Sequence, residues 1–125
     1  MLKAMLAIVV VFFAVGMTAQ MSVEEAFRQE NAEAFDHHFH SDVEMSLPGN
    51  ENRYTKADAI GLMEAFFSVH AVQQFKKVHS GSSRGKDSNY YIGQLTTDKG
   101  VYRVYIYYDV HDNTKDIHEL RIEKN

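Results

Sequence analysis

The amino-acid sequence predicts an α+β domain in which helices from the N-terminal half pack on a curved antiparallel sheet. Two observations favour this fold class. Residues 90–110 form a predicted hairpin, in which a polar turn at 96–100 joins two strand-like runs, and Val104 and Ile106 alternate with polar neighbours on the second arm. The expected order of elements is helix, helix, strand, strand, helix and then four strands. Strands that tight turns join in this way pair antiparallel.

Length and composition bound the kind of protein. The chain has 125 residues, enough for one domain, with 45% hydrophobic and 24% charged residues. Its formal net charge is −4, without a basic block, so we expect no nucleic-acid partner. The sequence contains no cysteine, which excludes disulfides, thiolate zinc sites and thiol nucleophiles.

Residues 1–19 have the pattern of a secretory signal peptide. Lys3 precedes an apolar run over residues 4–15, and small or polar residues follow. The run is shorter than the roughly 20 residues that a membrane span needs, although an uncleaved N-terminal anchor is the alternative. The sequence therefore predicts a secreted or periplasmic protein that is not a lipoprotein. Its single domain covers residues 20–125 and has no stable membrane insertion after cleavage.

The predicted helices begin at side chains that can cap them. Ser22 opens an S-x-x-E capping box, and the apolar stripe that follows changes phase near Glu30. We therefore expect two short helices, over 22–30 and 31–39, with Asn31 capping the second, and a single bent helix is the alternative. Thr55 caps a third helix, whose apolar stripe covers the sheet and which ends near residues 68–71.

The strands follow from alternation and turn residues. The first two cover residues 42–47 and 52–54, and the last four cover 75–80, 90–96, 101–110 and 117–123. Alternation in the first strand places Asp42 and Glu44 on the solvent side. In the last strand, simple alternation puts His118 on the same side as Leu120 and Ile122.

Several phrases resemble a known family. DVEMSLPG followed by YTKADA, then FKKVHSG, YYIGQLTTDKGVYRVYIYY and a closing IHELRIEKN are similar to a family of small secreted bacterial proteins of unknown function. That family has a nuclear transport factor 2-like (cystatin-like) fold. The resemblance implies a cone-shaped sheet with a pocket between its concave face and the helices, and dimerisation through the outer sheet face. It transfers no activity, because fold does not settle function.

Histidines and acids give weak signals for chemistry. The densest group is His37-His38-x-His40, with acids on either side, but adjacent helical residues point about 100° apart and cannot all face one ion. Histidines also favour helix C-termini for structural reasons. His79 is a possible base at the end of a strand, and hydrogen bonding beside a turn is the simpler interpretation. We predict no catalytic residue, no cofactor and no metal.

Tyrosines point instead to surfaces. Six of the seven tyrosines lie between residues 90 and 108, so both faces of the hairpin are aromatic. Arg103, Tyr105 and Tyr107 share one face and are predicted to form an interface, through which the chain would be a homodimer. A predicted pocket for a small apolar ligand is lined by Tyr54, Phe66, Val104 and Ile106.

These patterns favour a small-ligand-binding or protein-interaction module. The alternatives are an isomerase- or hydrolase-like enzyme that uses the pocket, and a purely structural dimeric partner whose own side chains fill the cone.

Overall fold

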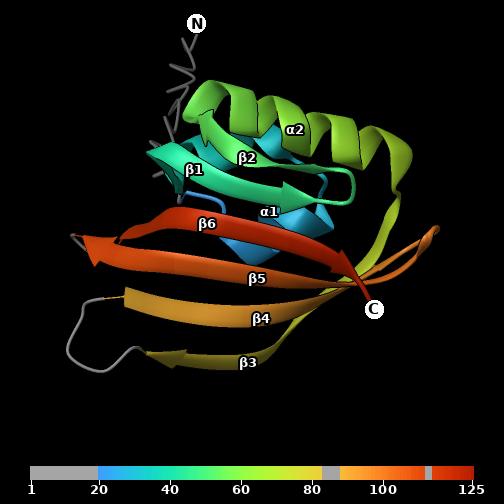
Figure 1. Ribbon diagram of the computed structural model, residues 1–125. Helices are drawn as coiled ribbons and strands as arrows, with labels where there is room; N and C mark the ends of the chain where they lie inside the picture. Colours follow the sequence, from blue (N-terminus) through green and yellow to red (C-terminus); the bar gives the residue numbers. More distant parts are fainter. Residues whose placement is uncertain (1–19, 83–87, 112–113) are drawn as a thin grey trace, which may run out of the picture.

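The computed structural model describes residues 20–82, 88–111 and 114–125, so the predicted signal peptide lies outside the described residues. Figure 1 shows six strands side by side in one curved sheet, with the helices gathered on one face. None of the helices in this part of the chain has the length and apolar character that crossing a membrane requires. The predicted α+β class and the predicted order of elements are confirmed.

Three helical elements precede or interrupt the strands. They are α1 (Val23–Arg28), the 3₁₀ helix η1 (Ala32–His37) and α2 (Lys56–Val69). The predicted N-caps are confirmed, because the side-chain oxygens of Ser22, Asn31 and Thr55 each accept a hydrogen bond from the backbone N–H three residues on. The predicted break also occurs where expected, since Glu30 has a φ of 53°, which interrupts the helical backbone.

The sheet has the strand order β2-β1-β6-β5-β4-β3. Its strands are β1 (Phe39–Leu47), β2 (Asn50–Thr55), β3 (Val72–Ser82), β4 (Ser88–Thr97), β5 (Gly100–His111) and β6 (Thr114–Lys124). The predicted hairpin is confirmed as β4 and β5. The prediction of an antiparallel sheet needs one correction, because β1 pairs with β6 in parallel. This pairing joins the first and last strands of the chain, and no local pattern in the sequence encodes it.

Aromatic side chains fill the space between the helices and the sheet. Phe27 of α1 stacks on Phe75 of β3 with ring centroids 4.6 Å apart, and it meets Phe35 and Phe67 edge to face. The Arg28 guanidinium donates two hydrogen bonds, of 3.2 and 3.0 Å, to the carbonyl oxygen of Phe75. The N-terminal helix is thereby fixed to the edge strand at the far end of the sheet.

Two strand positions differ from the sequence-based expectation. His40 lies on β1 rather than just past the end of a helix, because the strand begins at Phe39. The register of β5 and β6 shifts at His118, where a β-bulge places an extra residue. Leu120 and Ile122 are buried against the helices, whereas His118 is half-buried and lines a surface hollow with Tyr107. The expectation that these three residues share a side is therefore wrong.

Candidate functional site

The outer face of the sheet, opposite the helices, carries the predicted interface residues. Arg103 and Tyr107 are exposed and Tyr105 is half-buried, whereas Val104 and Ile106 between them are fully buried under the helices. Val104 and Ile106 therefore lie on the inner face of the hairpin, and Arg103, Tyr105 and Tyr107 lie on the outer face. Across the strands, Tyr107 pairs with Tyr90, and their ring centroids lie 6.2 Å apart.

Close to Tyr107, two histidines and two aspartates form a cluster, here called the His–Asp cluster (His40, Asp109, Asp116 and His118). The Nδ1–H of His40 donates to Asp116 Oδ2 at 2.8 Å. The Nε2–H of His118 donates to Asp109 Oδ2 at 2.7 Å and lies 3.8 Å from Asp116 Oδ2. The two imidazole rings lie next to each other at an interplanar angle of 40°, with centroids 4.5 Å apart.

The fold assembles this cluster from three strands. Parallel pairing of β1 with β6 sets Phe39 beside Ile117, so the next residues along, His40 and His118, are neighbours. Antiparallel pairing of β5 with β6 sets Asp109 opposite Asp116. The D-x-H spacing of Asp116 and His118 is a signal that sequence reasoning could have used, because residues two apart on a strand share a face. The partner histidine on β1 could not be found without the parallel pairing.

The hollow next to the cluster has a volume of about 470 Å³. Its lining is rich in charge and consists of His40, Asp42, Glu44, Arg53, Tyr107, His118 and Glu119. The guanidinium of Arg53 pairs with Glu44 at 2.8 Å, so the carboxylates in excess leave the hollow acidic. Asp42 and Glu44 lie on the exposed side of β1, as their alternation predicts.

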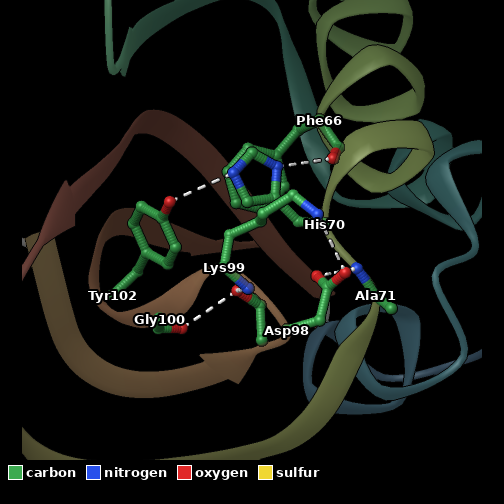
Figure 2. A network of polar contacts seen from close by, with 8 residues as sticks. Phe66, His70, Ala71, Asp98, Lys99, Gly100 and Tyr102 are labelled. Atoms are coloured by element: carbon green, nitrogen blue, oxygen red, sulfur yellow. Dashed lines mark hydrogen bonds and ion pairs between the residues drawn. The ribbon is translucent and has the colours of Figure 1, made fainter.

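A second candidate site lies at the C-terminal end of α2, where a small apolar hollow of about 180 Å³ opens. Leu47, Pro48, Asn50, Leu62, Ala65, Phe66, Val69 and His70 line it. Figure 2 shows His70 held between the main-chain carbonyl of Phe66 and the hydroxyl of Tyr102. Because a carbonyl oxygen only accepts, Nδ1 of His70 carries the proton there, at 2.9 Å, and its Nε2 can accept from the tyrosine at 3.1 Å. His70 was not singled out by the sequence, although it lies within residues 68–71, where the third helix was predicted to end.

The predicted pocket residues fall in two groups. Phe66 lines the apolar hollow, and the hydroxyl of Tyr54 donates to Asn50, another residue of its wall, at 3.0 Å. Val104 and Ile106 have no exposed surface and belong to the packed core. The structure therefore does not gather these four residues around one hollow.

The other histidines that the sequence analysis considered lie away from both hollows. His37 and His38 lie at the end of η1, where His37 is exposed and Nε2 of the buried His38 contacts the carbonyl oxygen of Met21 at 2.6 Å. His79 is exposed near the hydroxyl of Tyr90, at 3.3 Å. The predicted group of three histidines thus does not share one face, because only His40 reaches the His–Asp cluster.

Comparisons with known proteins identify a family and solved structures with the same fold. Residues 20–123 match the family described as "Domain of unknown function (DUF4783)". A crystal structure of a DUF4783 family protein from Bacteroides uniformis is similar with 31% identity, 82% of this chain and 94% of that chain covered, and a TM-score of 0.74. A family protein from Bacteroides fragilis has 27% identity, covers 84% of this chain and 99% of its own, and gives a TM-score of 0.73.

The wider fold is also matched. A nuclear transport factor 2-like protein from Cytophaga hutchinsonii shares 11% identity over 81% of this chain and 88% of that chain, with a TM-score of 0.60, which bears on the fold alone. A search of curated proteins found no match. The predicted resemblance to a family of unknown function with this fold is confirmed.

Proposed function

This chain belongs to the DUF4783 family, and within the fold that the family shares we propose that it is a protein-interaction module whose partner is a second copy of the same chain. The observation that carries the proposal is the contrast between the two faces of the sheet. The helix-covered face is occupied by packed side chains, whereas the outer face presents tyrosines and arginines to solvent. Exposed aromatic area flanked by arginine is typical of interface centres.

The charges on this face suit association of two identical copies. Arg121 lies between Glu119 and Glu123, with nitrogen–oxygen distances of 3.9 and 3.7 Å, and Arg103 pairs across the strands with Glu123. A two-fold axis places each surface patch against its own copy, so a patch with both signs of charge can pair arginine with glutamate in both directions. Tyr105 and Tyr107 then supply the apolar centre.

The test is the mass of the purified protein in solution. Sedimentation equilibrium should give a dimer for the wild-type protein and a monomer for Tyr107→Glu, because the new carboxylates of the two copies would be buried against each other. Val69→Glu is the matched control, since Val69 is 57% exposed on α2, away from the sheet's outer face, and this variant should remain dimeric. A wild-type protein that stays monomeric, or a Tyr107→Glu variant that stays dimeric, would refute the proposal.

A second candidate function is binding of a small apolar molecule in the hollow at the end of α2. The observation that favours it is a mostly apolar wall with two polar side chains, Asn50 and His70, of which His70 is held by the hydroxyl of Tyr102. A volume of about 180 Å³ can hold a group of the size of a small aromatic ring. Titration with phenol, followed by NMR, should shift the amide signals of the lining residues first. Shifts spread evenly over the surface would argue against a site.

We also propose that the domain acts outside the cytoplasm, after cleavage of residues 1–19. The support is the pattern of Lys3, an apolar run and small residues in the sequence. Mass spectrometry of the protein recovered from a periplasmic or secreted fraction should give a new N-terminus near residue 20. Recovery of the intact chain in a membrane fraction would contradict it.

A further inference from the structure

We propose that His40, Asp116 and His118 bind one divalent transition-metal ion of the zinc class on the outer face of the sheet. Each residue offers one ligand atom, and these three atoms all lie within 4.8 Å of one another. Two imidazoles and one carboxylate form a donor set that zinc uses in sites with an open fourth position. The inference is independent of the proposed self-association, because all three ligands come from one copy.

The distances suit the ion after small rotations of the side chains. With bonds of about 2.0–2.2 Å in a tetrahedron, ligand atoms lie about 3.3 Å apart. The separations from Asp116 Oδ2 are 2.8 Å to His40 Nδ1 and 3.8 Å to His118 Nε2, on either side of that value. The cluster therefore needs adjustment within the side chains rather than movement of the strands.

Two protons now occupy the place that the ion would take. Both ring nitrogens that face the cluster point at carboxylates, so each carries a proton toward Asp109 or Asp116. A metal ion would replace these protons, because only a deprotonated imidazole nitrogen binds a metal. Asp109 would lose its hydrogen bond from His118, and a water molecule can take the fourth position.

The surroundings favour a cation and leave it a path of entry. Asp42, Glu44 and Glu119 line the adjoining hollow, and the positive charge of Arg53 is already paired with Glu44. The side chains of His40 and His118 are 42% and 39% exposed, so an ion can reach them from solvent. A cluster of carboxylates alone would attract a hard cation weakly, but the two imidazoles select a softer transition ion.

Isothermal titration calorimetry of the chelator-treated protein with zinc chloride tests the proposal. We expect one bound ion per chain, and an affinity loss in His40→Gln and His118→Gln that exceeds the roughly 10–100-fold cost of losing a supporting group. His37→Gln is the matched control, because His37 is an exposed histidine close in sequence that lies outside the cluster, and its affinity should be unchanged. Magnesium chloride should give no comparable binding.

Circular dichroism shows whether each variant is folded, and NMR of the wild-type protein gives a readout that needs no variant. Zinc should shift the ring signals of His40 and His118 before those of the other histidines. Cobalt(II) should give the intense visible absorption of a four-coordinate ion. Absence of zinc binding, equal binding of magnesium, or an equal loss in His37→Gln would each overturn the assignment. A stoichiometry of one ion per chain that persists in Arg103→Glu, an outer-face variant outside both the hollow and the His–Asp cluster, separates this result from the outcome of the self-association test.

Discussion

Tyr91 of β4 is buried to 0% exposure with a hydroxyl that has no hydrogen-bond partner among the described residues. Burial, and after it the negative charge of Glu24, raises the pKa of this phenol, so it stays neutral over the usual pH range. The ammonium groups of Lys77 and Lys115 lie 5.1 and 5.0 Å from its ring centroid, and these contacts use the ring face rather than the hydroxyl.

We therefore expect Tyr91→Phe to stabilise the protein by about 1 kcal/mol, because an unpaired buried hydroxyl costs about 1–3 kcal/mol. Urea unfolding measures the change. Tyr108→Phe is the control, because Tyr108 is only half-buried and its substitution should matter less. Destabilisation by Tyr91→Phe would mean that a buried water satisfies the hydroxyl.

The hydrogen bonds of Asp98, in the turn between β4 and β5, make the stability of the protein depend on pH. The backbone N–H of Ala71 donates to its carboxylate at 2.8 Å, and the Lys99 ammonium adds a contact of 3.1 Å (Figure 2). The Ala71 hydrogen bond, followed by that to Lys99, holds the pKa of Asp98 below its ordinary value of 3.8. A carboxyl with a lowered folded pKa stabilises the protein above its unfolded value, and this contribution is lost as the pH falls through the folded one.

Thermal unfolding of the wild-type protein and Asp98→Asn should thus differ most at neutral pH, and the difference should close as the pH falls below 3.8. The amide keeps an acceptor for Ala71 but carries no charge. Lys99→Ala should reproduce only part of the loss, because Lys99 is the smaller cause. A constant difference across the whole pH range would contradict this assignment.

On β4, the buried Gly93 packs directly against a core ring of the neighbouring strand β3. A Cβ atom there would lie 2.4 Å from Cζ of Phe75, whose ring is held against Phe27. We expect Gly93→Ala to destabilise the protein by about 1–3 kcal/mol, the usual cost of overpacking.

Gly61 on α2 gives the opposite expectation from the same substitution. Nothing lies within 4 Å of a Cβ built there, so Gly61→Ala should stabilise the protein by up to about 1 kcal/mol through helix propensity. Chemical denaturation of both variants tests the pair. Equal effects at the two positions would show that the ring of Phe75 can move aside.

Features that depend on residues close together in the sequence could be predicted from it. Features that depend on residues far apart in the sequence could not. The caps at Ser22, Asn31 and Thr55 and the alternation of the β4–β5 hairpin depend on neighbours along the chain, and they were predicted correctly. The His–Asp cluster depends on the parallel pairing of β1 with β6 and on the bulge at His118, which bring together residues up to 78 positions apart in sequence. Neither feature leaves a periodic signal.

The four residues predicted to line one pocket do not surround one hollow, and side-chain packing explains why. Val104 and Ile106 were placed correctly on the inner face, but a pocket there would need that face to be left open. Phe27, Phe35, Phe67 and Phe75 fill the space instead, and alternation along a strand carries no information on how large the facing side chains are.

The whole molecule depends on this one aromatic core, since Phe27 touches a residue in each of η1, α2 and β3. Phe27→Ala should therefore cost about 3–5 kcal/mol, a large share of the roughly 5–15 kcal/mol that stabilises a domain of this size. Because the helices have no other face to pack on, far-ultraviolet circular dichroism and aromatic signals should be lost together in one transition at lower urea concentration. Val69→Ala on the exposed side of α2 should change the free energy of unfolding by less than about 0.5 kcal/mol. If the sheet instead survived in Phe27→Ala while only the helical signal was lost, the helices would be a separable cover, and the cone beneath them would be able to open for a ligand.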